Sequence, residues 1–517
     1  MRIADYFDGV VSRQRDRPAL IENGQSIDFA SAQRVVHAAA HALQREHGLR
    51  AGAHVALYAP NDHRIPLLLL AINRADMVWL SAHTRNPVNV NRDVLAAMDC
   101  EFVFFHSAYA NAVPRLRAGL PKVVRFVCID APSEHGPSLD EWMAGHWGTF
   151  AAGPEDPAAA CFLQPTGGTT GPSKAAVHTH RSMEIAVLGG ISAYEIDEDA
   201  CYLAVAPLTH AGGIAALQTL VAGGSVVVLN MQDPAQVFDA LAQHRVTFTF
   251  VPPTLLYMLM AHPRARTADF SSLKVLLTGG APVSPDKTKE AVGIFGAVVY
   301  EGYGQTECFM PLTVKSPRDY LMPDGSFNEA VLRSAGRPAR TVRIEVMDAQ
   351  GQLLPCGERG ELVVQSSQVM REYYRDPEET EAASRFGWRH TGDVGIKDER
   401  GYITIVDRLK DMVVSGGFNI YPAQIEAVIL AHDAVLDCAV VGVPDDKWGE
   451  AVKAVIQLKA DRTTTEDEII ALCRERLGGV YAPKSVEFWA DIPRSAVGKV
   501  LRREVRSKFW QGHWRAV

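Results

Sequence analysis

The chain has 517 residues, of which 47% are hydrophobic and 22% are charged, values that are typical of a globular protein. Its formal net charge of −8 argues against general nucleic-acid binding, which depends on an excess of lysine and arginine. The eight cysteines include no Cys-x-x-Cys pair, which argues against a disulfide framework and against a zinc site. The first residues lack the apolar core of a signal peptide, and no apolar run reaches the ~20 residues of a membrane span. We therefore expect a cytoplasmic protein with no integral membrane segment and no nucleic-acid partner.

Helical and strand patterns alternate through the first 300 residues. Apolar residues recur at helical spacing over Ser31–Gln44, and continuous apolar runs cover Ala53–Tyr58 and Phe102–Phe105. Such runs are typical of strands that are buried on both faces of a parallel sheet. The alternation predicts a doubly wound α/β architecture, with later strands at Ser225–Leu229, Val246–Val251, Lys274–Leu277 and Ala297–Tyr300.

The pattern changes near residue 343. Short strands separated by turns predict a small β-barrel-like subdomain at about 343–406. Beyond it, a helix is expected from Pro422 and strands over Cys438–Val443 and Ala451–Leu458. Thr465 and Glu468 form a capping box that predicts a helix to residue 477. We therefore expect a large N-terminal domain over residues 1–408 and a small α+β C-terminal domain over residues 409–517.

A stretch rich in glycine and threonine runs from Gln164 to Lys174. A loop of this composition can turn backbone N–H groups and hydroxyls onto phosphate oxygens, and its lysine adds a point charge. It is not a Walker loop, because Ala175 follows Lys174 where serine or threonine is required. The alternative interpretation is a flexible surface loop.

A second stretch, from Glu301 to Glu307, combines an aromatic ring with polar groups. Tyr303 offers a flat face for a purine, Thr306 a hydroxyl for a phosphate, and Glu307 a hard oxygen for Mg²⁺. The alternative is a polar loop after a strand. The turn Thr278–Pro282 has few side-chain atoms, so a ligand can approach its backbone closely.

Several later segments carry chemistry only in combination. Taken alone, His210 is a packed histidine, and Lys499 and Arg502 are solvated surface charges. Further polar or glycine-rich segments are Trp388–Asp393, Asp407–Asp411 and Ser415–Ile420.

Together these motifs resemble those of the adenylate-forming superfamily, which includes acyl-CoA synthetases, luciferases and peptide-synthetase adenylation domains. The family's phosphate loop reads approximately Thr-Ser/Gly-Gly-Thr-Thr-Gly-x-Pro-Lys-Gly. Ser173 and Ala175 depart from that pattern, but neither change removes a group that faces phosphate. Six motifs occur in the family's order over nearly the whole chain.

The resemblance implies a role for each matching residue. Lys499, His210, Thr306 and Glu307 are expected to be catalytic, with Glu307 as the metal ligand, and Lys410 is the expected hinge. Ser415, Gly416 and Gly417 are expected to line the CoA tunnel. The expected acyl pocket consists of His210, Gly279, Gly280, Cys308, Phe309 and Met310. The residues expected to bind ATP or AMP are Thr166, Gly167, Gly168, Thr169, Thr170, Gly171, Lys174, Gly280, Ala281, Pro282, Glu301, Gly302, Tyr303, Gly304, Thr306, Asp393, Arg408 and Lys499.

The implied activity is that of an AMP-forming carboxylate:CoA ligase that uses ATP, Mg²⁺ and coenzyme A. The segment from Tyr202 to Gly224 contains no aspartate to pair an α-ammonium group, which argues against amino-acid substrates. Medium-chain fatty acids and aryl or arylpropenoic acids both fit a glycine-floored pocket. Two alternatives stay open: transfer of the adenylate to a separate carrier protein, and a non-catalytic nucleotide- or acyl-binding protein. The oligomeric state is also open, a homodimer included.

Overall fold

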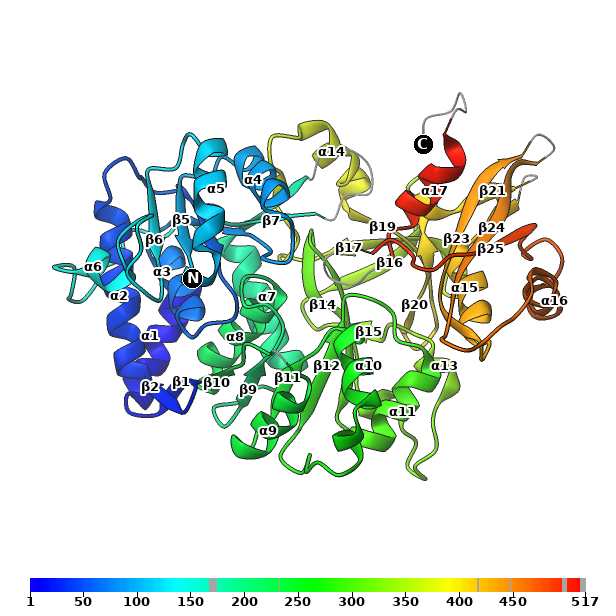
Figure 1. The fold of residues 1–517 in the computed structure, drawn as a ribbon, viewed down its shortest axis with the longest axis horizontal. Helices are drawn as coiled ribbons and strands as arrows, with labels where there is room; N and C mark the ends of the chain where they lie inside the picture. Colours follow the sequence, from blue (N-terminus) through cyan, green and yellow to red (C-terminus); the bar gives the residue numbers. More distant parts are fainter. Residues whose placement is uncertain (167–173, 232, 416–417, 446–447, 495–499, 512–517) are drawn as a thin grey trace. The chain divides into compact units, whose positions relative to one another are not determined.

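The computed structural model describes residues 1–517 except 167–173, 232, 416–417, 446–447, 495–499 and 512–517 (Figure 1). The chain forms two compact units. The large unit consists of Met1–Arg343 and Gln365–Ser384, and the small unit of Ile344–Val364 and Arg385–Val517. Among the described residues, no helix combines the length and the hydropathy that crossing a bilayer requires.

The large unit contains a seven-stranded sheet with the strand order β18-β8-β7-β4-β3-β5-β6. Its central strands are parallel, whereas β8 and β18 pair antiparallel at one edge. The bounds are β3 His54–Tyr58, β4 Val78–Ser81, β5 Phe102–Phe105, β6 Arg125–Cys128, β7 Ala160–Pro165, β8 Ala175–Thr179 and β18 Glu372–Tyr373.

A nine-stranded sheet with the order β15-β14-β13-β12-β11-β9-β10-β1-β2 forms the other half of the large unit. The strands from β1 through β10, β9, β11 and β12 to β13 are parallel. The bounds are β1 Pro18–Glu22, β2 Gln25–Asp28, β9 Cys201–Ala204, β10 Ser225–Val228, β11 Phe248–Phe250, β12 Val275–Gly279, β13 Val299–Gln305, β14 Cys308–Lys315 and β15 Arg337–Pro338.

Both sheets bury both faces, as the continuous apolar runs predict. In β3, Val55 and Leu57 belong to one core cluster, and Ala56 and Tyr58 belong to another on the opposite face. The first cluster joins the two sheets through helices α1 Ile3–Gln14, α2 Phe29–Arg45, α3 Arg64–Arg74, α7 His180–Ala193 and α8 Ala211–Ala222. The outer faces are covered by α4 Val88–Ala97, α5 Val113–Gly119, α9 Ala235–Gln243, α10 Pro253–Ala261 and α11 Pro285–Phe295. The predicted doubly wound α/β architecture is confirmed (Figure 1).

The small unit contains two further sheets. The first, at the position of the expected barrel-like subdomain, is a four-stranded sheet of β16 Arg343–Met347, β17 Arg359–Gln365, β19 Arg389–Lys397 and β20 Ile403–Arg408, in which β19 pairs antiparallel with β17 and β20. The second consists of β21 Val413–Ser415, β22 Phe418–Ile420, β23 Val435–Asp445, β24 Gly449–Leu458 and β25 Ser485–Phe488, with helices α15 Pro422–Leu430, α16 Glu466–Leu477 and α17 Arg502–Trp510.

The predicted capping box at the start of α16 is confirmed. Glu468 N donates to Thr465 Oγ1, and Thr465 N donates to Glu468 Oε2. The shorter elements are α6 Leu139–Met143, α12 Pro317–Tyr320, α13 Glu329–Leu332, α14 Pro377–Ala382 and the 3₁₀ turns η1 Ser107–Ala112, η2 Pro263–Arg266, η3 Arg385–Gly387 and η4 Leu409–Asp411.

Candidate active site

Thr306 and Glu307 form the tip of a tight β-hairpin. Strand β13 continues past Tyr300 to Gln305, which pairs with Cys308 at the start of β14. Tyr303 therefore lies on a strand and not in a loop. The hairpin extends from the carboxyl end of a parallel strand, the edge at which α/β sheets bind ligands.

Glu307 is held by a strand that is distant in sequence. Tyr373 on β18 donates from its hydroxyl to Glu307 Oε1 over 2.6 Å, and Met370 N donates to the Glu307 carbonyl over 2.8 Å. The Tyr373 ring also lies beneath the cation of Lys174, whose Nζ is 5.4 Å from the ring centroid. Lys174 Nζ makes an ion pair with Glu379 Oε2 at 2.8 Å. One tyrosine thus connects Lys174, at the end of the glycine-rich segment, with the expected metal ligand.

The two ends of the glycine-rich loop are joined at its base. Thr166 N donates to the Lys174 carbonyl over 2.7 Å, between the antiparallel strands β7 and β8. Gly167, Gly168, Thr169, Thr170 and Gly171 lie outside the described residues. Gln164, next to this base, places its Nε2 3.1 Å from Nε2 of His210, which precedes α8. The structure therefore brings His210 to the base of the loop.

His178 anchors the hairpin tip from inside the large unit. Its Nε2 lies 2.7 Å from the Thr306 carbonyl, and its ring stacks on Phe309 with 3.9 Å between the centroids. Phe309 in turn contacts Phe162, which stacks on Trp79. His178 is fully buried, and with Tyr373 it is a site residue that the sequence did not identify. Neither residue belongs to a glycine-rich or polar motif that would have drawn attention to it.

Several positions near the hairpin must be glycine, because a side chain there would collide with neighbouring atoms. A Cβ on Gly304 would lie 2.5 Å from the Met310 nitrogen. A Cβ on Gly279 would lie 2.5 Å from the Gly302 carbonyl oxygen. Gly280 has a φ of +84°, a conformation that suits glycine. Ala281 is half-buried and Pro282 is exposed beyond it. Cys308 is buried, and Met310 lies across Gly279 and Gly302.

The side chain of Glu301 makes an ion pair and a hydrogen bond within the large unit. Its Oε1 makes an ion pair with Lys315 Nζ at 2.9 Å and accepts a hydrogen bond from Thr288 Oγ1 over 2.8 Å. Lys315 is 1% exposed in its side chain. Removal of one member of such a buried pair leaves an uncompensated charge. Glu301 thereby fixes β13 on the side of the sheet that packs against α11.

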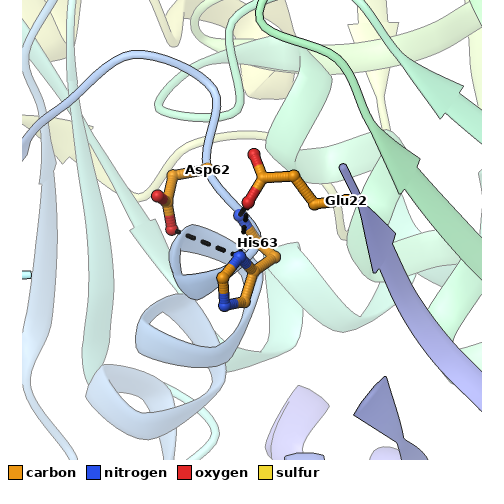
Figure 2. A group of neighbouring side chains, drawn as sticks. All are labelled: Glu22, Asp62 and His63. Atoms are coloured by element: carbon orange, nitrogen blue, oxygen red, sulfur yellow. Dashed lines mark hydrogen bonds and ion pairs between the residues drawn. The ribbon is translucent and has the colours of Figure 1, made fainter. Parts of the chain in front are cut away.

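A second cluster of ionisable side chains consists of Glu22, at the end of β1, and Asp62 and His63, between β3 and α3 (Figure 2). His63 Nδ1 is 2.5 Å from Glu22 Oε2 and 3.8 Å from Asp62 Oδ1. Asp62 also accepts hydrogen bonds from the backbone and guanidinium of Arg64. These contacts orient the turn between β3 and α3. A structural role in this turn is therefore sufficient to explain why the three side chains lie together.

The small unit carries the remaining expected residues. Asp393 on β19 is buried and pairs in register with Arg408 on β20, whose Nε lies 3.5 Å from Asp393 Oδ1. Lys410 is the middle residue of η4. Ser415 ends β21. Gly416, Gly417 and Lys499 lie outside the described residues.

Arg502 joins the residues on either side of Lys410. Its Nη1 lies 3.3 Å from Asp407 Oδ1 and 3.1 Å from Asp411 Oδ2, and its Nε donates to Glu426 over 2.8 Å. Burial raises the pKa of Asp407 above its ordinary value, against the opposing effect of Arg502. The charge of Arg502 therefore offsets three carboxylates that surround the expected hinge.

The fold and these motifs define a nucleotide-dependent, adenylate-forming enzyme. Sequence models for the AMP-binding enzyme family and for the AMP-binding enzyme C-terminal domain match residues 7–374 and 424–499. The chain belongs to this family. Its expected place in the adenylate-forming superfamily, near the acyl-CoA synthetases, is confirmed, as are the use of ATP, Mg²⁺ and coenzyme A.

The relatives span almost the whole chain. A feruloyl-CoA synthase from Amycolatopsis sp is 36% identical over 505 residues, which cover 96% of this chain and 98% of that protein. A long-chain-fatty-acid–CoA ligase from Escherichia coli O157:H7 is 31% identical, with 98% and 94% covered. Among solved structures, the amide bond synthetase McbA from Marinactinospora thermotolerans has a TM-score of 0.88 at 30% identity, with 98% of this chain and 100% of that chain covered.

Proposed function

We propose that the protein joins an arylpropenoic acid to coenzyme A through an acyl-adenylate. The observation that carries the phosphate chemistry is the convergence of Lys174 and Glu307 on Tyr373. The similarity to feruloyl-CoA synthase over 96% of the chain supports the arylpropenoic class. The paired glycines Gly279 and Gly302 support the same class, because the side chain that lies over both of them is the flexible Met310, which can move aside for a planar acid.

In the first half-reaction, a carboxylate oxygen of the acid attacks the α-phosphorus of ATP, and pyrophosphate leaves. Thr166 and Lys174 hold the polyphosphate from the two ends of the glycine-rich loop, and Thr306 presents its hydroxyl to the α-phosphate. Glu307 would hold Mg²⁺, which neutralises phosphate charge when bound. The carboxylate of Glu307, oriented by Tyr373 at the hairpin tip, fits that ion. Lys499 would stabilise the negative charge that develops at the α-phosphate.

In the second half-reaction, the sulfur of coenzyme A attacks the acyl carbon, and AMP leaves with the bonding electrons. His210 lies at the carboxylate end of the acyl pocket, and Gln164 fixes the orientation of its ring. Ser415, Gly416 and Gly417 would line the path of the thiol.

We also propose a domain boundary between residues 408 and 409, with Lys410 as the pivot of a mobile C-terminal domain. The ion pairs of Arg502 with Asp407 and Asp411 support this placement. They hold the residues on both sides of Lys410, so a change in backbone conformation can concentrate in the short segment between them. A cytoplasmic location is proposed because all eight cysteines are free thiols.

The proposal is tested by incubating the purified protein with ATP, Mg²⁺ and coenzyme A and with ferulate, 4-coumarate or octanoate. AMP and thioester are measured by chromatography and mass spectrometry. We expect both products with the two arylpropenoic acids and weaker turnover of octanoate. Turnover of octanoate alone would contradict the proposed substrate class. Adenylate without thioester would contradict the proposed acceptor, and it would direct attention to an amine or a carrier protein.

A further inference from the structure

Among the residues that the structure describes, Tyr194 is the one tyrosine with a fully buried hydroxyl that has no hydrogen-bond partner. Its side chain is 1% exposed at the end of α7, and its ring stacks near Phe248. Two other fully buried tyrosines find carbonyl partners: Tyr320 donates to Val299 over 2.7 Å, and Tyr202 to Gly212 over 3.5 Å. A buried hydroxyl without a partner loses its water and gains nothing in return. The Tyr194 hydroxyl is therefore an unexplained polar group in an apolar core.

This hydroxyl lies beside the expected acyl pocket. A Cβ placed on Gly302 would lie 3.0 Å from Tyr194 Oη and 2.5 Å from Met310 Sδ. A Cβ placed on Gly279, which pairs with Gly302 in register, would lie 2.8 Å from the same sulfur. The hydroxyl and the Met310 side chain thus meet over two adjacent glycines.

Met310 is the movable member of this group. Its side chain is half-buried, whereas Tyr194 is fixed within the core shared by the two sheets. Methionine is unbranched and has three rotatable bonds, so it changes conformation more readily than the residues around it. A shift of Met310 would open a space over Gly279 and Gly302. The Tyr194 hydroxyl would then border that space beside Gly302.

The distance along β13 suits an arylpropenoic acid. Gly302 precedes Thr306 by four residues, which corresponds to a separation of up to about 13 Å along a strand. An acid whose carboxylate lies near Thr306 can therefore extend its ring toward Gly302. A hydroxyl at the far end of that ring would come to Tyr194.

We propose that Tyr194 is the specificity-determining residue that recognises a ring hydroxyl on the acid. The inference rests on the proposed function and adds a second polar side chain, besides His210, to the expected acyl pocket. Burial raises the pKa of Tyr194, so its hydroxyl stays protonated at neutral pH and can both donate and accept. A site that is built to hydrogen-bond a hydroxyl discriminates against the analogue that lacks it, because the protein group is then left unpaired.

The test compares 4-coumarate with cinnamate, two acids that differ by one ring hydroxyl. We expect Tyr194→Phe to lower kcat/KM for 4-coumarate about tenfold, to leave cinnamate within about twofold, and to leave the KM for ATP unchanged. Tyr202→Phe is the matched control, and it should affect the two acids equally. Equal changes for both acids in Tyr194→Phe, or no change in either, would overturn the inference.

A second measurement does not depend on activity. Because the Tyr194 hydroxyl has no partner in the ligand-free protein, Tyr194→Phe should not lower the Tm, whereas Tyr320→Phe should lower it. An equal loss of Tm in both variants would mean that Tyr194 has a structural partner. If the parent protein makes no thioester from either acid, the proposed function fails. If it makes both without preference, only the role of Tyr194 fails.

Discussion

The hydroxyl of Tyr373 donates a hydrogen bond to Glu307, with 2.6 Å between Oη and Oε1. The two residues are 66 positions apart, and they meet because β18 adds to the edge of the seven-stranded sheet at β8. Strand β8 begins directly after Lys174, so the same edge also carries the end of the glycine-rich segment. The pairing of β18 with β8 is therefore what brings Lys174 and the expected metal ligand together.

Glu307→Gln should greatly lower the rate of adenylate formation and weaken its dependence on Mg²⁺. The amide keeps the shape of the side chain but loses the charge that the ion prefers. The measurement is pyrophosphate exchange at a series of Mg²⁺ concentrations. Tyr373→Phe provides the milder comparison, with a loss of roughly tenfold, since a hydrogen bond to a charged group contributes ~1.5–3 kcal/mol. An unaltered Mg²⁺ titration in Glu307→Gln would reject Glu307 as the ligand.

Lys174→Met should raise the KM for ATP by roughly tenfold or more, because the variant loses a cation from the phosphate site. The ion pair with Glu379 does not prevent this role. Glu379 is half-exposed, and exposed pairs contribute only about 0–1 kcal/mol, so Lys174 can exchange partners when ATP binds. Glu379→Gln is the control and should leave the KM for ATP within roughly fivefold. The KM values are obtained from initial rates at varied ATP concentrations. A normal KM for ATP in Lys174→Met would contradict the proposed role of Lys174 in binding phosphate.

The parts of the fold that depend on local pattern could be predicted from the sequence. The strands buried on both faces appear as continuous apolar runs, and the helix after Thr465 is marked by its capping box. The hairpin at Thr306 was less evident, because Tyr303 and Gln305 are polar residues on a strand that leaves the core. Polar composition there indicated a loop, whereas pairing with β14 makes it a strand.

The site could be predicted only where it is carried by a motif. Glycines and a lysine in one loop indicate phosphate binding, but Tyr373 and His178 come into contact with the Thr306–Glu307 hairpin only through strand pairing and ring stacking with distant residues. Tyr194 is a further case, since its missing hydrogen bond is visible only in three dimensions. Contacts between residues far apart in sequence leave no spacing pattern to detect.

Lys410→Pro should leave ATP-dependent adenylate formation within roughly tenfold of normal, a barrier change of ~1.4 kcal/mol. Thioester formation should fall much further. Proline fixes φ near −65°, so the backbone change proposed for this segment would be denied. The measurement is a pair of single-turnover assays, one for each half-reaction, with circular dichroism to confirm the fold. A parallel loss in both half-reactions would place the hinge elsewhere.

Lys499→Ala should abolish adenylate formation but largely spare thioester formation from supplied acyl-AMP. The lysine is expected to act on the developing charge at the α-phosphate, which is absent from the second half-reaction. Rapid-quench analysis of each half-reaction separates the two effects, and Lys484→Ala, a lysine outside the motif, serves as the control. Equal losses in both half-reactions would indicate a structural role.

The most direct test of the account is the complete balance of one reaction. Purified protein is given 4-coumarate, ATP, Mg²⁺ and coenzyme A, and the four products are quantified together. We expect AMP, pyrophosphate and 4-coumaroyl-CoA in equal amounts, with acyl-adenylate accumulating only when coenzyme A is omitted. Release of ADP and phosphate in place of AMP and pyrophosphate, or AMP formation without thioester when coenzyme A is present, would contradict the proposed function as an arylpropenoic acid–CoA ligase.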